Sequence, residues 1–405
     1  MAKLAIHGGT PVRTKPFPRW PQWDERERTN LLQVLESGAW FRFQGHMVEE
    51  FERRFAAYCG SKHALAVTSG TKALEASVAA LELEKGAEVI VPSYTFVTTA
   101  TSVTNSGLQV VFADVDPETL NVTVETLEAV RTPRTRAVIP VHFGGCPCDM
   151  TAIMEWANQH GIAVIEDCSH AHGTRWDGRM VGTIGQLGAF SFQNSKNMTA
   201  GEGGIVLTQS DELIAKLYAK HSYGQQPGKA WYDHFTVSSN LRMTEWAGAV
   251  LLAQLERLEE QTERRLQNAR RLDRMIASYP HLKVVGTSDP RASRRAYHLY
   301  IYRYLGTLEG VTKSQIVKAL AAEGIPTSVG YPRPLHHQPL WQRVTPAPHQ
   351  GPFGELRLPN VEAVCEQAIW HPQPMLLGTD EDMRDIELAY EKVMSSLDEL
   401  RRVAA

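Results

Sequence analysis

One lysine, Lys196, lies between an apolar run and a glycine-rich turn within residues 188–204. A lysine amine attacks a carbonyl only when it is deprotonated, so a lysine that is partly desolvated or near other cations can form a Schiff base. Taken alone, Lys196 is better explained as a surface lysine on a hairpin. Upstream, however, a strand-like run at residues 162–165 leads into Asp167. Because ligand groups in open α/β sheets collect at the carboxyl ends of strands, we expect Asp167 and Lys196 to share a site.

An aspartate upstream of a reactive lysine is typical of pyridoxal phosphate chemistry, in which a carboxylate keeps the pyridine nitrogen protonated and the lysine holds the aldehyde. A third element supports this interpretation: residues 64–74 have the pattern of a strand, a small-residue turn containing Gly70 and Thr71, and the start of a helix. Free backbone N–H groups at a helix N-terminus suit a phosphate dianion. An ordinary Ser/Thr helix cap explains the turn by itself, but the three elements together favour the cofactor.

The order of expected elements predicts an α/β fold. From about residue 62 to residue 208, apolar strand-like runs alternate with helical periodicity, which indicates a mostly parallel sheet covered by helices on both faces. Residues 245–278 have the pattern of one or two long helices, followed by a strand at 298–302 and a helix at 313–323. We therefore expect a large domain at residues 1–255 and a smaller C-terminal α/β domain at 256–405.

The composition of the chain argues against several classes of partner and site. The 405 residues carry 42 Lys+Arg and 45 Asp+Glu without a long basic run, so we expect no nucleic-acid partner. The five cysteines show neither a disulfide framework nor zinc-ligand spacing, which indicates reduced thiols in a cytoplasmic protein. No apolar stretch is long enough to cross a membrane, so we expect no membrane partner. Asp114 and Asp116 have the pattern of a strand-end turn, and we expect no metal site.

The chain resembles the DegT/DnrJ/EryC1/StrS family of fold-type I, pyridoxal-phosphate-dependent aminotransferases, which make amino sugars and aminocyclitols. The resemblance covers nearly the whole chain and depends on many ordered matches. The matching segments are residues 68–74, 91–96, 113–116, 140–142, 166–170, 190–196, 201–204 and 239–243.

The resemblance implies roles around the cofactor ring. Lys196 would carry the cofactor as a Schiff base, and Asp167 would pair with its pyridinium nitrogen. Phe96 would stack on the ring, and His170 would support the ring near Asp167. From the residues alone, Phe96 is equally consistent with core packing, and His170 with a core or loop histidine.

The resemblance also implies a phosphate site that joins two subunits. Gly70, Thr71 and Ser191 would hold the phosphate, and Asn240 would reach it from the neighbouring subunit of a homodimer with composite active sites. Ser191 is equally consistent with an ordinary strand serine. Asn240 is equally consistent with a cap of the helix that follows it.

For the reaction, the resemblance implies transfer of an amino group from glutamine or glutamate to a polyhydroxylated ketone, with pyridoxamine phosphate as the intermediate form of the cofactor. Local likeness to the aminocyclitol and aminohydroxybenzoate branch favours a free cyclic ketone of the inosose or aminodehydroquinate kind over a nucleotide-linked keto sugar. The expected substrate contacts, each of which is also consistent with packing or loop structure, are Trp40, Arg42, Tyr331 and His336.

Two other function classes stay open from the sequence. A related dehydratase uses pyridoxamine phosphate to dehydrate a deoxysugar, but a histidine replaces the lysine there, so Lys196 argues against it. A non-enzymatic sensor that keeps the fold and binds an aminated product would not turn over its cofactor. Loss of the yellow cofactor colour on addition of an amino acid separates an enzyme from a sensor.

Overall fold

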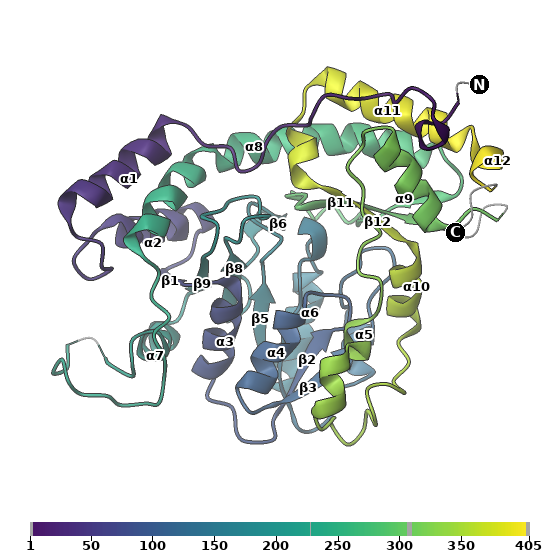
Figure 1. Cartoon of the computed structure of the whole chain (residues 1–405). Helices are drawn as coiled ribbons and strands as arrows, with labels where there is room; N and C mark the ends of the chain where they lie inside the picture. The colour runs from purple at the N-terminus through teal and green to yellow at the C-terminus, as the bar shows by residue number, and fades with distance from the viewer. Residues whose placement is uncertain (1–2, 227, 306–309, 402–405) are drawn as a thin grey trace.

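The computed structural model describes residues 3–226, 228–305 and 310–401 (Figure 1). Within these ranges, a seven-stranded sheet has the strand order β1-β9-β8-β5-β4-β2-β3. Neighbouring strands are parallel from β3 to β8, and β9 is antiparallel to both β8 and β1. The predicted mostly parallel sheet is therefore confirmed. Its strands are β1 His63–Val67, β2 Glu88–Pro92, β3 Gln109–Ala113, β4 Thr135–Val138, β5 Ala163–Asp167, β8 Leu187–Ser191 and β9 Gly204–Thr208.

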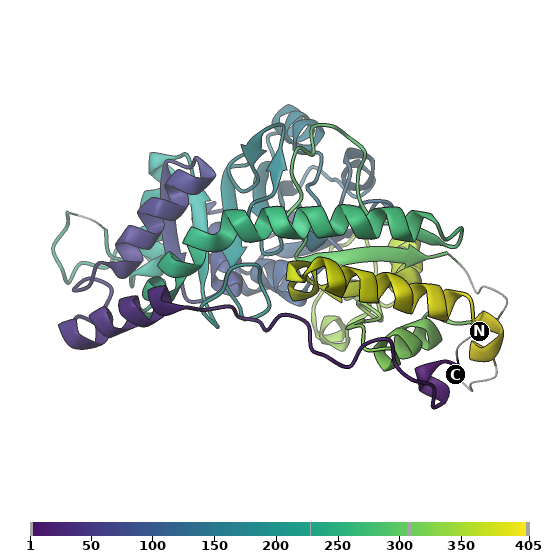
Figure 2. The same cartoon turned by 90° about the horizontal axis from the view of Figure 1, so that it is seen from above.

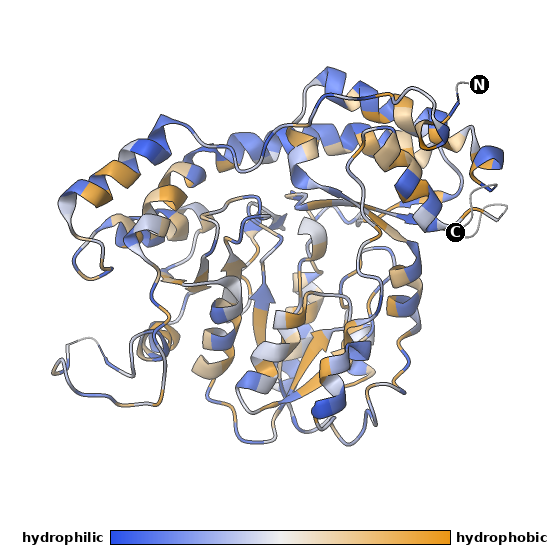
Figure 3. Ribbon diagram, viewed as in Figure 1, coloured by the Kyte–Doolittle hydropathy of each residue, from blue (hydrophilic) through white to orange (hydrophobic). Residues whose placement is uncertain are grey.

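Helices cover both faces of this sheet, because its strands are apolar on both sides. In β2, Val89 and Val91 pack into one core with α3 and α4, whereas Ile90 packs into a second core with α2, α6 and α8. Most strands of the sheet are largely orange when coloured by hydropathy, whereas the helices around them mix blue and orange (Figure 3). The helices of the two cores are α1 Glu25–Ser37, α2 Met47–Cys59, α3 Gly70–Ala80, α4 Val97–Asn105, α5 Val124–Glu128, α6 Met150–His160, α7 Asp211–His221, α8 Glu245–Ala277 and α10 Pro359–Gln367.

A smaller unit forms around a three-stranded antiparallel sheet of order β10-β11-β12 within the described residues. It has its own core, to which Tyr302 of β11 and Ile316 of α9 contribute. The predicted smaller α/β unit is thus present. Its elements are β10 Leu282–Val284, β11 Leu299–Tyr304, α9 Lys313–Ala322, β12 Ala368–Pro372, α11 Asp380–Met394 and α12 Leu397–Leu400. Short elements complete the fold: β6 Arg175–Trp176, β7 Arg179–Met180, η1 Ala5–His7, η2 Phe143–Gly145, η3 Leu335–His337, η4 Pro339–Arg343 and η5 Gln373–Leu377.

The long helix α8 joins the two units as one continuous helix (Figure 2). Its first half packs on α1 and α2, and its second half packs on β10, η5 and α11. The expected domain boundary at residue 255 falls inside this helix, and the N-terminal Leu4 packs into the core of the smaller unit. The division at 255 stays a prediction, with its outermost residues 1–2 and 402–405 outside the described ranges.

All five cysteines, Cys59, Cys146, Cys148, Cys168 and Cys365, are buried free thiols. No helix in the described part of the chain is long and apolar enough to cross a membrane.

Candidate active site

A cavity of about 620 Å³, which we call the central cavity, is lined by the carboxyl edge of the large sheet and by residues of the smaller unit. This placement follows from the topology, because parallel strands end at one edge and the loops after them meet there. The predicted residues that line the cavity are Gly70, Thr71, Phe96, Asp167, His170, Ser191, Lys196 and Tyr331.

Asp167 is the last residue of β5, and both of its carboxylate oxygens accept hydrogen bonds. Thr99 Oγ1, from α4, donates to Oδ2 over 2.9 Å, and the backbone N–H of Ser169 donates to Oδ1 over 3.1 Å. The backbone N–H of Asp167 donates to Pro140 O. The carboxylate is therefore fixed in one orientation at the cavity wall, as a partner for a protonated ring nitrogen requires.

Lys196 lies on the loop that follows β8 and is half-buried at the cavity. Its backbone N–H donates to Gln193 O, which closes a tight turn. Burial lowers the pKa of Lys196 to about 8, and the charge of Asp167 opposes part of this shift. Desolvation disfavours the charged amine, so a larger share of Lys196 than of an ordinary lysine is nucleophilic near neutral pH.

His170 lies in the loop after β5 and is buried against the ring of His298, with the ring centroids 4.3 Å apart. Burial, together with the charge of Lys196, holds the pKa of His170 well below its usual range. The Gly144 N–H points at Nδ1 of His170 over 3.3 Å, so the proton of the neutral ring lies on Nε2. His170 therefore adds a neutral donor to the cavity wall that also contains Asp167.

The N-terminus of α3 forms an anion cradle opposite Ser191. Ser69 caps this helix by accepting hydrogen bonds from the N–H groups of Lys72 and Ala73. The N–H groups of Gly70 and Thr71 have no partner among the described residues, and they line the cavity. A Cβ atom on Gly70 would lie 2.5 Å from Ser191 Cβ, so only glycine leaves this space open. Unpaired amides at a helix N-terminus are a phosphate site.

Phe96 lies at the N-cap position of α4, with 55% of its surface exposed at the cavity. The alternative that Phe96 packs in the core is therefore wrong. Asn240 is exposed and lies away from the central cavity of its own chain. It does not cap α8 either, because Thr244 is the N-cap residue of that helix. The phosphate role expected for Asn240 in the neighbouring subunit stays a prediction.

Three of the four expected substrate contacts lie away from the cavity of their own chain. Trp40 packs against Trp246, and Arg42 forms an ion pair with Glu52 over 2.7 Å. His336 is buried, with Nδ1 2.6 Å from Ser93 Oγ. His336 therefore does not reach the cavity of its own chain, because η3, which carries it, packs against Ser93 at the end of β2. Tyr331 alone lines the cavity.

Sequence reasoning missed Thr99, His298 and Gln373, which belong to this site. Thr99 lies near the start of the same helix as Phe96, and this spacing could have indicated that it faces Asp167. His298 and Gln373 come from the smaller unit and line the central cavity. No local pattern marks them, because only tertiary packing brings that unit to the sheet edge.

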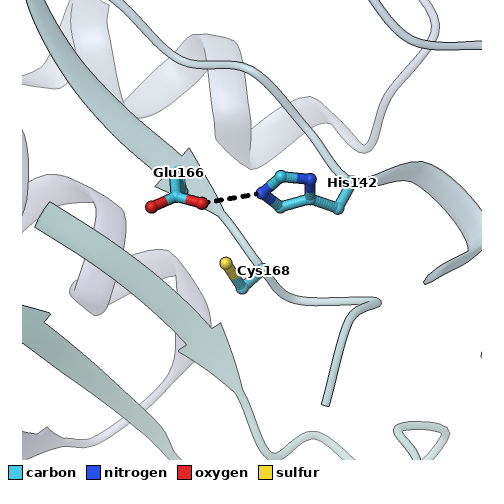
Figure 4. Close-up of side chains that lie close together, drawn as sticks. All are labelled: His142, Glu166 and Cys168. Carbon is cyan, nitrogen blue, oxygen red and sulfur yellow. Dashed lines mark hydrogen bonds and ion pairs between the residues drawn. The ribbon is translucent and has the colours of Figure 1, made fainter. Parts of the chain in front are cut away.

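Behind β5, Glu166 holds the strand from the opposite face (Figure 4). It accepts hydrogen bonds from the N–H groups of Gly182, Ile184 and Gly185, and it pairs with His142 Nε2 over 3.1 Å. Burial alone would raise the pKa of Glu166, but these hydrogen bonds outweigh burial and lower it. Cys168 lies close to this pair. Because Glu166 and His142 are already hydrogen-bonded, we interpret the cluster as a brace for the strand that carries Asp167.

The fold around Lys196 is that of the fold-type I, pyridoxal-phosphate-dependent aminotransferases, as a solved relative shows. The crystal structure of 3-amino-5-hydroxybenzoic acid (AHBA) synthase superimposes with a TM-score of 0.86 at 33% sequence identity, covering 95% of this chain and 100% of the relative. The chain belongs to the DegT/DnrJ/EryC1/StrS aminotransferase family, whose model matches residues 21–387.

Two relatives with assigned activities are similar along almost the whole chain. A 3-amino-5-hydroxybenzoate synthase of Amycolatopsis mediterranei (strain S699) is 36% identical over 368 residues, covering 90% of this chain and 94% of the relative. An L-glutamine:2-deoxy-scyllo-inosose aminotransferase of Streptoalloteichus tenebrarius is 34% identical over 429 residues, covering 98% and 99%. The predicted family, fold class and enzyme class are confirmed, and the roles of individual residues stay predictions.

The glycine at the cradle gives a first prediction. In Gly70→Ala, the added methyl group enters the space beside Ser191 and displaces the phosphate from the free amides. Since hydrogen bonds to a charged group contribute about 1.5–3 kcal/mol, we expect pyridoxal phosphate to bind roughly tenfold or more weakly. Fluorescence titration measures the affinity, and a thermal melt checks folding. Unchanged affinity in a folded variant would place the phosphate elsewhere.

The lowered pKa of Lys196 gives a second prediction. In the cofactor-free protein, labelling of Lys196 by a small aldehyde with borohydride trapping should rise through about pH 8 and then level off, whereas an ordinary lysine titrates near about 10.4. Peptide mass spectrometry locates the label. Asp167→Asn should lower the midpoint further, because it removes the charge that favours the ammonium form. A midpoint near that of ordinary lysines would contradict the desolvation of Lys196.

Proposed function

We propose that this aminotransferase uses pyridoxal phosphate to move an amino group from glutamine or glutamate to a free polyhydroxylated cyclic ketone, in aminocyclitol or amino sugar biosynthesis. One observation carries the proposal: a single cavity collects the desolvated Lys196, the fixed carboxylate of Asp167 and the open N-terminus of α3. When bound, the cofactor supplies the carbonyl that accepts the amino group and a ring that takes up electrons from the reacting carbon.

The residues of the cavity fit this cofactor. The amides of Gly70 and Thr71 and the hydroxyl of Ser191 would hold its phosphate. Asp167 would hold the proton of the ring nitrogen, with Thr99 Oγ1 and Ser169 N–H fixing the carboxylate. By holding that proton before the reaction, Asp167 would stabilise the negative charge that develops when the substrate loses a proton.

Lys196 has two tasks in this proposal. Its Nζ atom would hold the cofactor until the amino-acid donor displaces it. The freed amine, with its lowered pKa, would then take the proton from the α-carbon of the donor and carry it within the cavity. The donor would leave as a keto acid whose keto oxygen comes from water, and the ketone acceptor would take up the amino group by the same steps in reverse, with release of water.

The proposed acceptor draws support from the relatives that are named for 3-amino-5-hydroxybenzoate synthesis and for 2-deoxy-scyllo-inosose. The second name also favours glutamine as the donor. A cytoplasmic location is part of the proposal, supported by the five free, buried thiols.

The proposed active unit is a homodimer. The segment between α7 and α8 extends away from the body of the molecule (Figures 1 and 2). It exposes Trp231, Tyr232 and Val237 at 80%, 72% and 96%, and α1 is preceded by an exposed Trp23. Large exposed apolar side chains are typical of an interface. Asn240 lies near the end of this segment, and in the proposed dimer it would reach the phosphate of the other site.

Removal of the lysine amine tests the catalytic assignment. In Lys196→Ala, transfer from glutamine to 2-deoxy-scyllo-inosose should fall by roughly 10²–10⁴-fold or below detection, because both anchor and proton carrier are lost. Mass spectrometry of the aminated product measures the reaction, with scyllo-inosose and a nucleotide-linked keto sugar as competing acceptors. The control Lys62→Ala removes an exposed lysine and should stay active. Near-normal activity of Lys196→Ala would exclude the assignment.

Hybrid dimers test the shared site. Lys196→Ala and Asn240→Asp should each be inactive, the second because it places a negative charge beside the phosphate. Mixing them should restore about a quarter of wild-type activity, since random exchange makes about half of the dimers hybrids and each hybrid has one intact site. Subunit exchange is checked by native mass spectrometry. Complete exchange without recovered activity would argue that each chain forms its own site.

A further inference from the structure

Arg265 of α8 is a fully buried cation close to the central cavity. Its Nε and Nη2 atoms both donate to Gln373 Oε1, over 2.9 and 2.7 Å, and Nη2 lies 3.5 Å from Gln261 Oε1. Nη1 is buried and has no hydrogen-bond partner. Trp20 covers the guanidinium, with its ring centroid 5.5 Å from Arg265 Cζ.

This cation has no counter-charge in its own surroundings. Every contact of Arg265 given above is to a neutral amide or an indole, and within the described residues no carboxylate forms an ion pair with it. Burial lowers the pKa of Arg265 to about 9, which still leaves it protonated at neutral pH. A buried charge without a counter-charge is strongly unfavourable, so an anion that arrives nearby relieves this energy.

Gln373 connects Arg265 to the cavity. It is 1% exposed, begins η5 and lines the central cavity. Because Arg265 has only donors, the atom of Gln373 that faces it must be the amide oxygen. The amide nitrogen Nε2 is therefore held in the other direction, and it is buried without a partner. Beside it in the cavity wall, His298 is also buried with an unpartnered Nδ1.

We propose that Gln373, oriented by Arg265, forms a carboxylate subsite in the wall of the central cavity, where Nε2 donates a hydrogen bond to the α-carboxylate of the amino-acid donor. The inference rests on the proposed aminotransferase function. Every amino-acid donor carries this carboxylate, so a subsite for it serves any donor. A neutral cyclitol ketone that enters the same cavity brings no counter-charge for Arg265. The charge of Arg265 is then uncompensated, and this favours replacement of the acceptor product by the next amino-acid donor.

Gln373→Glu tests the subsite, because it keeps the shape of the side chain and places a carboxylate on Arg265. The rate of the first half-reaction is measured by cofactor absorbance with glutamine and with 4-aminobutanamide, which is glutamine without its α-carboxylate. For glutamine, kcat/KM should fall roughly 10- to 100-fold, mainly through KM, since a charge-assisted hydrogen bond is replaced by repulsion. For 4-aminobutanamide it should stay the same.

One further readout is independent of turnover. In the absence of substrate, Gln373→Glu should raise the midpoint of thermal unfolding, because the new carboxylate compensates Arg265. The matched control Gln267→Glu adds the same charge on the exposed face of α8, where it replaces a hydrogen bond to Glu263 by repulsion. It should not raise the melting midpoint and should leave the preference for glutamine unchanged.

The outcomes separate the subsite from the function on which it rests. If wild-type protein converts its cofactor with glutamine but Gln373→Glu keeps the wild-type preference for glutamine over 4-aminobutanamide, the subsite is wrong and the aminotransferase function stands. Loss confined to ketones that carry a carboxylate, in the second half-reaction, would keep the subsite and assign it to the acceptor. If wild-type protein neither binds glutamine nor transfers its amino group, both proposals fail.

Discussion

The pairing of β5 with β8 fixes the site. These parallel strands pair in the register Ile165 with Leu187 and Asp167 with Ala189, so they end at the same edge of the sheet. Asp167 stands at the end of one strand, and the loop after the other carries Lys196. Because side chains alternate along a strand, Asp167 faces the cavity while Glu166 is held on the opposite face. A shift of one residue in this register would exchange the two carboxylates and remove the ring-nitrogen partner.

Desolvation is the second constraint, and it acts on the whole cavity. The same burial that lowers the pKa of Lys196 to about 8 holds the pKa values of His170 and His298 well below their usual range. The two histidines are therefore neutral and add hydrogen-bonding groups without adding charge. Arg265 keeps its charge, which leaves the wall of the cavity suited to an anion. The site thus combines Lys196, whose amine loses its proton more readily than that of an ordinary lysine, with Arg265, which stays charged.

The sequence predicts well what depends on local pattern. Asp167, Gly70 and Ser191 follow or end apolar strands, and strand ends in a parallel sheet meet at one edge, so their convergence follows from the alternation of elements. The helix predicted from residue 245 begins at Glu245, but its cap is Thr244 and not Asn240, because several residues offer the same capping chemistry and pattern alone does not choose among them. The boundary expected at residue 255 lies inside α8 for a related reason. The amphipathic periodicity of α8 continues without a break, although the elements that its apolar face contacts change from α1 and α2 to β10, η5 and α11.

What the sequence does not give is long-range packing. Arg42 and His336 are typical substrate-binding residue types, yet they are bonded to Glu52 and Ser93 within the fold. Gln373 has no motif, and only the contact with Arg265, 108 residues away, gives its amide a defined direction. A side chain of this kind is recognised from its unpartnered buried atoms, which no single-sequence pattern contains.

The proposed function requires that the fixed carboxylate of Asp167 hold a proton on the ring nitrogen of the bound cofactor. The ¹⁵N NMR shift of that nitrogen, in protein loaded with ¹⁵N-labelled pyridoxal phosphate, reports this proton. We expect a protonated-pyridinium shift that does not change from pH 6 to pH 9 in the wild type, and an unprotonated shift in Asp167→Asn. A wild-type nitrogen that titrates like free pyridoxal phosphate, or one that Asp167→Asn leaves unchanged, would contradict it.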